Sequence, residues 1–152
     1  MLRTRFQDQL KQSLHAKDEI AVSTLRLIIA AMKDRDIAVR SKGNWEGISD
    51  DEILSMLQSM IKQRNESIKM YEVGNRPELA AREASEIRVI ETFLPEQLTA
   101  EEIKTAIESA VVSVNATGIK DMGKVIGELK AKYTGQMDFS KVSGMVKERL
   151  AG

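Results

Sequence analysis

Cysteine is absent from this sequence of 152 residues, and histidine occurs once, as His15. The lack of cysteine excludes disulfides, zinc–thiolate sites and a cysteine nucleophile, and a single histidine excludes a histidine-based metal cluster. We therefore expect neither a metal nor a cofactor. His15 falls near the end of an amphipathic pattern without a candidate nucleophile, so a surface role is favoured over that of a general base.

Aromatic residues are scarce, and the longest apolar run, Leu27–Met32, is far too short to span a bilayer. Residues 1–10 lack the apolar core of a signal peptide, so we expect a cytoplasmic protein that does not enter a membrane. Lysine plus arginine and aspartate plus glutamate both number 23. No net charge therefore steers the chain toward a polyanion, and any nucleic-acid contact requires a local patch.

Apolar residues recur at helical spacing along the chain, and no alternating strand pattern is present. Capping boxes are expected to begin helices at Ser49 and Thr99, because a Glu follows each three positions later. Pro95 interrupts the pattern, since it lacks the N–H that continues a helix. The sequence predicts an all-α protein with a bundle of about four helices in 1–95 and a three-helix domain in 96–152.

Two further residues are expected to mark helix ends. Gly74 is predicted to stop a helix by adopting a positive φ, which glycine does at no steric cost. Asp121 is predicted to cap the helix that follows it. Both predictions depend on local sequence alone.

The common enzyme motifs are missing: there is no Walker loop, Rossmann glycine pattern, GxSxG or HExxH. Pairs of acidic residues do occur, as Asp50-Asp51 and Glu101-Glu102. They lie at expected helix starts, where capping explains them better than acid–base chemistry. We therefore predict no self-contained catalytic site.

Arg64 and Trp45 are candidates for either a structural or a partner-binding role. Arg64 interrupts an apolar stripe, where a charge must be paired or must emerge at the edge. We favour an internal ion pair with Glu86 or Glu91 over a ligand or phosphate contact. Trp45 lies in a loop between glycines, and we favour packing against the core over exposure to a partner.

The segment Gly118–Gly127 carries the strongest local signal. Gly123 and Gly127 share one helix face, and each costs a helix about 1 kcal/mol relative to alanine. That cost indicates close approach by a neighbouring helix, which spacing alone favours, or by a nucleic-acid backbone at a helix start that attracts phosphate. From Gly118 onward, seven basic residues accompany four acidic ones. The candidate nucleic-acid contacts are Lys120, Lys124, Gly123, Gly127, Lys130 and Lys132.

Three blocks of the sequence resemble the YqeY family: Thr24–Ile28, Lys62–Tyr71 and Gly118–Gly127. The junction Phe93–Leu98 fits the same family, and the resemblance extends over nearly the whole chain. It implies an all-helical protein of two domains. The second domain would be similar to the tail of GatB, a subunit of glutamine-dependent tRNA amidotransferases.

In GatB that tail contacts tRNA and is not the site of chemistry, so the resemblance implies a binding role. The family is associated with carbon–nitrogen ligase activity that uses glutamine as amido-N-donor. A kinase-type ATP loop and the amidase Ser/Lys machinery are both absent from this sequence. The residues therefore do not support independent catalysis, and an enzyme with an unrecognised site is the least supported hypothesis.

Two binding hypotheses follow. The first is an accessory protein that binds tRNA or another structured RNA and is associated with a glutamine-dependent tRNA amidotransferase. The alternative is a protein–protein adaptor that docks to an amidotransferase or another translation component, with Arg64 and Trp45 as anchors. Salt dependence separates them, because phosphate contacts weaken steeply with salt and an apolar docking surface does not.

Overall fold

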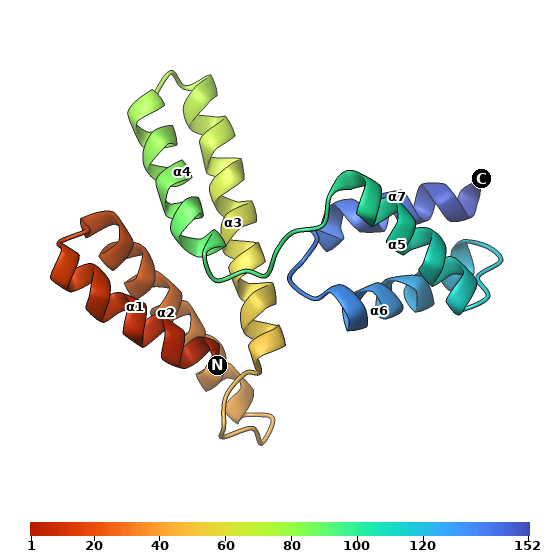
Figure 1. Cartoon of the computed structure of the whole chain (residues 1–152), viewed down its shortest axis with the longest axis horizontal. Helices are drawn as coiled ribbons and strands as arrows, with labels where there is room; N and C mark the ends of the chain where they lie inside the picture. Colours follow the sequence, from red (N-terminus) through yellow and green to blue (C-terminus); the bar gives the residue numbers. More distant parts are fainter. The chain divides into compact units, whose positions relative to one another are not determined.

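The computed structural model describes all 152 residues and is all-α, as predicted: it contains seven α-helices, one short 3₁₀-helix and no strand (Figure 1). The elements in order are α1 (Leu2–Ala16), α2 (Glu19–Arg40), α3 (Asp50–Val73), α4 (Pro77–Glu91), α5 (Ala100–Ser113), the 3₁₀-helix η1 (Ile119–Asp121), α6 (Met122–Tyr133) and α7 (Phe139–Ala151). None of these helices has the length and apolar character required to cross a membrane.

The chain divides into two compact units, Met1–Leu94 and Pro95–Gly152. Residues 92–99 carry no helix between α4 and α5. Helix α4 already ends at Glu91, and Pro95 follows the turn after it, where it cannot donate a backbone hydrogen bond. The residues after it belong to the second unit. Leu98 donates its backbone N–H to the Gln136 carbonyl at 2.9 Å, and Gln97 Nε2 donates to the Gly135 carbonyl at 2.6 Å.

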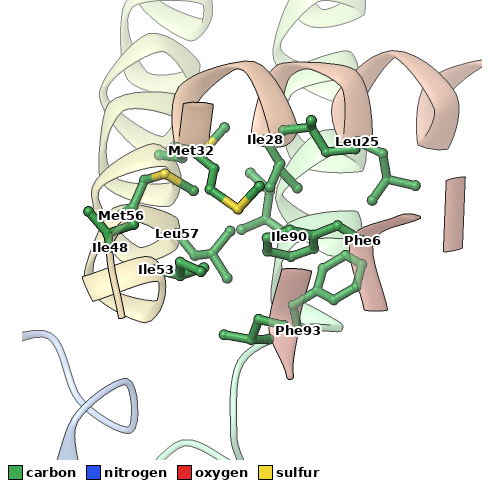
Figure 2. Packing of buried hydrophobic residues seen from close by; sticks show 13 residues of the cluster. Phe6, Leu25, Ile28, Met32, Ile48, Ile53, Met56, Leu57, Ile90 and Phe93 are labelled. Carbon is green, nitrogen blue, oxygen red and sulfur yellow. The ribbon is translucent and has the colours of Figure 1, made fainter. Parts of the chain in front are cut away.

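The N-terminal unit consists of two helical hairpins, α1–α2 and α3–α4, and α2 packs on α4 as well as on α1 (Figure 1). Its core is built from aliphatic and methionine side chains with two phenylalanines (Figure 2). The rings of Phe6 and Phe93 meet edge to face with their centroids 4.9 Å apart. This contact joins the first helix of the unit to its last residues.

The helix starts follow the local signals. Ser49 and Glu52 form a complete capping box at α3, and Thr99 and Glu102 form another at α5, as the sequence predicted. The predicted role of Gly74 is wrong, because its φ is −79°. Asn75 takes the left-handed conformation instead, with φ 57°, which asparagine tolerates better than most residues.

The C-terminal unit packs α5, α6 and α7 around a second core. Its most deeply buried members are aliphatic or methionine residues from α6, the α6–α7 loop and α7, namely Val125, Leu129, Met137, Val142 and Val146. Helix α5 adds the buried residues Ala106, Ile107, Ala110 and Val111. The inward-facing residues of α6 are spaced four apart. Consequently the opposite side of α6 is left outside this core.

Candidate nucleic-acid interface

The entry to α6 is a 3₁₀ turn, η1, that positions Asp121 differently from the prediction. Asp121 makes no side-chain bond to the first turn of α6. Its Oδ2 instead accepts from the backbone N–H of Thr117 at 2.8 Å and from the Thr117 hydroxyl at 3.2 Å. The prediction that Asp121 caps α6 is therefore wrong, because the carboxylate turns back to satisfy the preceding loop.

The pKa of Asp121 lies below its ordinary value. The main cause is the backbone N–H of Thr117, supported by the Thr117 hydroxyl and by the charges of Lys124 and Lys120, while desolvation opposes the shift. The carboxylate is thus held in its ionised form. It places one negative charge beside the two lysines at the start of α6.

Gly123 and Gly127 lie on a face of α6 that no other part of the unit covers. A Cβ atom added at either position would meet no atom within 4 Å, and the same holds at Gly118. The packing of a neighbouring helix, which spacing alone favoured, is therefore not the reason for these glycines. With the exposed Ala131 four residues beyond Gly127, they form a strip of small residues along α6.

Three of the four predicted lysines border this strip. Lys120 lies in the turn that leads into α6, Lys124 precedes Gly127 by three residues, and Lys130 follows Gly127 by three. Residues three apart lie on the same side of a helix, so Lys124 and Lys130 flank Gly127. We call the surface formed by Lys120, Gly123, Lys124, Gly127, Lys130 and Ala131 the α6 face.

Lys132 does not belong to the α6 face. It lies five residues after Gly127, which turns it to another side of the helix, and its Nζ is 3.1 Å from Glu128 Oε1. The lysines of the α6 face also have local contacts. Lys124 Nζ lies 3.9 Å from Asp121 Oδ1, and Lys130 Nζ lies 5.9 Å from the centroid of the Phe139 ring.

Arg64 forms an internal ion pair, and of the two partners named from the sequence it contacts Glu86. Its Nε donates to Glu86 Oε2 at 3.0 Å, and one terminal nitrogen donates to the Met60 carbonyl at 3.3 Å. The two charged side chains are 13% and 10% exposed. Arg82 lies 3.6 Å from the other oxygen of Glu86, so the carboxylate serves two arginines.

Trp45 is 76% exposed, so the expectation that it packs on the core is wrong. The guanidinium carbon of Arg40 lies 5.8 Å from the centroid of its ring.

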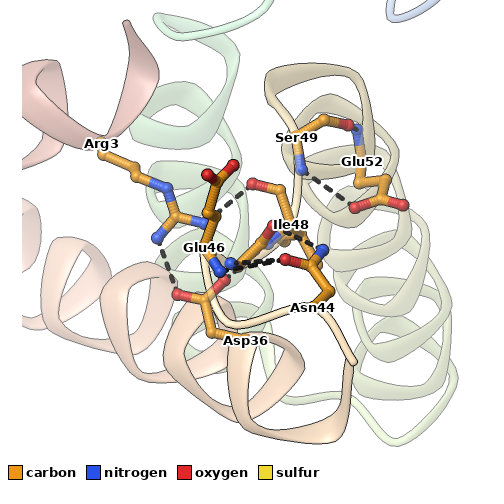
Figure 3. Close-up of polar contacts among 8 residues, drawn as sticks. Arg3, Asp36, Asn44, Glu46, Ile48, Ser49 and Glu52 are labelled. Carbon is orange, nitrogen blue, oxygen red and sulfur yellow. Dashed lines mark hydrogen bonds and ion pairs between the residues drawn. The ribbon is translucent and has the colours of Figure 1, made fainter. Parts of the chain in front are cut away.

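Sequence reasoning missed the role of Asp36, which organises the loop between α2 and α3. Its carboxylate accepts two hydrogen bonds of 2.7 Å from Arg3 and one of 2.9 Å from the Ile48 N–H (Figure 3). No local pattern signals this contact, because Arg3 and Asp36 lie 33 positions apart.

The sequence matches the family described as "Yqey-like protein" over residues 3–150, almost its whole length. The chain belongs to the YqeY family. The resemblance seen in the separate sequence blocks is thereby confirmed. The match includes both units and the whole of the α6 face.

Relatives of this YqeY-family chain include yeast proteins named "Altered inheritance of mitochondria protein 41, mitochondrial". The protein from Vanderwaltozyma polyspora is 30% identical over 101 residues, 65% of this chain and 52% of the relative. The proteins from Saccharomyces cerevisiae and Lachancea thermotolerans are 31% and 32% identical, over 56% of this chain in both cases and over 44% and 43% of their own lengths. The chain thus spans about half the length of these relatives, whose names describe them as mitochondrial.

The remaining histidine and acidic side chains of this YqeY-family chain point to no metal or catalytic centre. His15 is exposed in the last turn of α1. No group of three or more histidine or acidic side chains is arranged to hold a metal ion. The α6 face is therefore the surface on which the candidate residues from the sequence gather most closely.

Proposed function

We propose that this protein is an RNA-binding accessory protein whose α6 face contacts the phosphates of a structured RNA such as tRNA. One observation carries the proposal: Gly123 and Gly127 lie in open space beside exposed lysines. Each glycine in a helix interior costs about 1 kcal/mol relative to alanine. No packing contact inside the unit explains that cost, whereas the close approach of a ligand backbone would, because it requires a surface without side chains.

The electrostatics of the α6 face suit a phosphate. The first turn of a helix presents unpaired N–H groups and a positive dipole end, which favour anions. Lys120 and Lys124 add two charges at this end of α6. Asp121 offsets part of that charge, but its contact with Lys124 is long, at 3.9 Å, and Lys124 is 70% exposed. Such surface pairs contribute little, so Lys124 can turn to a phosphate at small cost.

The association with a glutamine-dependent amidotransferase is part of the same proposal and rests on the resemblance of the C-terminal unit to the GatB tail. In this role the protein would present RNA to a partner enzyme and perform no transfer of its own. The alternative adaptor function has less support, because one of its two expected anchors, Arg64, is committed to an internal ion pair with Glu86.

The test is binding of fluorescently labelled tRNA at low salt, measured by anisotropy. The double variant Lys120→Ala/Lys124→Ala should bind weaker by on the order of tenfold or more, because two phosphate contacts are lost. The matched control is Lys104→Ala/Lys147→Ala, which removes two exposed lysines of the same unit outside the α6 face. The control should bind nearly as the wild type does.

Two results would count against the proposal. Equal weakening in both double variants would mean that diffuse charge, and not the α6 face, attracts the RNA. A wild-type protein without measurable tRNA affinity at low salt would remove the nucleic-acid function and leave the adaptor function as the better hypothesis.

A further inference from the structure

Trp45 presents an aromatic ring that the fold does not use. It is the one tryptophan of the chain and is 76% exposed, in the loop between α2 and α3. An exposed tryptophan loses the large gain that burial of its ring would provide. The unit has a complete core without this side chain. A partner that covers the ring would recover that gain.

The loop that carries Trp45 is firmly built. The Asn44 side-chain oxygen accepts from the backbone N–H groups of Glu46 and Gly47 at 3.0 and 3.1 Å, and its nitrogen donates to the Gly47 carbonyl at 2.9 Å (Figure 3). Three bonds from one side chain thus close the turn around Trp45. The loop thus has a defined hydrogen-bonded structure while the Trp45 ring remains largely exposed, with Arg40 over it.

Asp36 fixes the end of the same loop. It accepts from Arg3 and from the Ile48 N–H, and Arg3 also donates to the Ile48 carbonyl at 2.8 Å. Gly47 lies against this pair with φ 96°, and a Cβ there would be 2.5 Å from an Asp36 oxygen. Glycine is therefore required at this position. A ring on a rigid loop loses little conformational entropy when it binds a partner.

The surroundings of the ring are charged and polar. The Arg40 guanidinium lies 5.8 Å from the ring centroid, within the range of a cation–π contact. Lys42 is exposed in the same loop, and Glu46 is the acidic neighbour. Arg40 thus lies over the ring, and the loop on either side of Trp45 carries one further positive and one negative side chain, both exposed. An anchor for a protein partner is normally surrounded by apolar contacts that exclude water, and this loop does not supply them.

We propose that Trp45 and Arg40 form a stacking site for an unpaired base of a single-stranded nucleic acid, with Arg40 and Lys42 near its phosphate. Aromatic rings combined with basic side chains are the means by which single strands are bound without sequence preference. The inference takes its ligand class from the proposed function and adds a second site, on the N-terminal unit. The Trp45 site would bind unpaired nucleotides, whereas the α6 face would bind the phosphates of structured RNA.

The fluorescence of the full-length protein tests this directly, because Trp45 is the one tryptophan and any change of emission belongs to it. The probe is an oligouridylate of about eight nucleotides, a length within the usual site size for single strands. The control probe is an abasic oligomer with the same number of phosphates. Stacking predicts quenching by oligouridylate and no quenching by the abasic oligomer. Absence of quenching, or equal quenching by both, would overturn the inference and favour a protein partner for Trp45.

Variants provide an independent measurement with labelled oligouridylate and anisotropy. Trp45→Ala should bind about tenfold weaker, Trp45→Phe should retain most of the affinity, and Arg40→Ala should fall between them. Val73→Ala is the matched control, because Val73 is an apolar residue of the same unit that is 90% exposed. Its affinity should equal that of the wild type. Equal affinities for Trp45→Ala and Val73→Ala would contradict the stacking site.

The two proposed sites can fail separately. If tRNA binding depends on Lys120 and Lys124 but oligouridylate leaves Trp45 fluorescence unchanged, the stacking site is wrong and the α6 interface stands. If oligouridylate quenches Trp45 but Lys120→Ala/Lys124→Ala binds tRNA as the wild type does, the α6 interface is wrong and the stacking site stands.

Discussion

Gly127 of α6 combines a cost to its helix with the absence of any packing neighbour. A Cβ at this position would meet no atom within 4 Å. Its backbone is ordinary helix, so alanine fits without strain. The proposed contact with RNA gives this glycine a role, and under that proposal stability and binding should respond to its replacement in opposite directions.

We predict that Gly127→Ala raises the free energy of unfolding by about 0.5–1 kcal/mol, because alanine is the better helix former and restricts the unfolded chain. Urea denaturation followed by circular dichroism measures the change. Gly127→Leu should also fold but should bind tRNA more weakly, since its side chain projects from the α6 face. A loss of stability in Gly127→Ala would show that a neighbour does pack against this position.

The ion pair between Arg64 and Glu86 should contribute strongly to stability. Arg64→Ala should cost about 3–5 kcal/mol of unfolding free energy, because it leaves Glu86 buried without its main partner. The control is Arg76→Ala, which breaks an exposed pair with Glu78 whose side chains are 61% and 62% exposed. That pair should contribute less than about 1 kcal/mol. Similar costs for both variants in urea denaturation would contradict the structural role of Arg64.

These residues also show what sequence can and cannot predict. The ion pair of Arg64 was predictable because the period of α3 places a charge on the apolar side, where it needs a partner. The exposure of Trp45 was not, since its loop depends on the contact of Asp36 with Arg3, far away in the chain. Likewise, helical period shows that Gly123 and Gly127 share a face but not whether another helix covers it.

At the scale of elements, the Arg3–Asp36 pair joins the start of α1 to α2 and to the loop before α3. Hydrogen bonds from Arg3 lower the pKa of Asp36, the Ile48 N–H and nearby positive charges add to this, and desolvation opposes it. The folded state therefore favours the ionised carboxylate more than the unfolded state does. This stabilisation is complete above the ordinary value of 3.8 and is lost as pH falls through the lower folded value.

We predict that the free energy of unfolding of the wild type decreases as pH is lowered from 5 to below 3.8, and that Asp36→Asn shows a smaller decrease. The control is Asp34→Asn, an exposed position on the same helix. Urea denaturation at several pH values provides the measurement. A pH dependence of Asp36→Asn equal to that of Asp34→Asn would contradict a role of this pair in acid stability.

Helix starts were more predictable than the loops between them. The two capping boxes were predictable because the partners lie three residues apart, as with Ser49 and Glu52. Asp121 is the exception, since its carboxylate bonds backward to Thr117 through a 3₁₀ turn that periodicity does not reveal. The preference of glycine for positive φ also gave a wrong prediction at the end of α3, where Asn75 and not Gly74 adopts this conformation.

At the scale of the whole molecule, each unit has a core of its own. The N-terminal core draws on α1, α2, α3 and α4, and the C-terminal core draws on α5, α6 and α7. We predict that residues 1–94 and 95–152, expressed separately, are both helical, and that their circular dichroism spectra add up to that of the full chain. The shorter fragment should be the less stable, because small domains bury a smaller fraction of their surface. An unfolded fragment would show that its core is not self-sufficient.

The salt dependence of tRNA binding tests whether the α6 face contacts RNA phosphates. The logarithm of the binding constant is measured against the logarithm of salt concentration for the wild type, for Lys120→Ala/Lys124→Ala and for the control Lys104→Ala/Lys147→Ala. Each lost phosphate contact on a duplex region reduces the magnitude of the slope by about 0.9, so the first variant should lose about 1.8 and the control almost nothing. A slope for Lys120→Ala/Lys124→Ala equal to that of the wild type would show that these two lysines make no phosphate contacts.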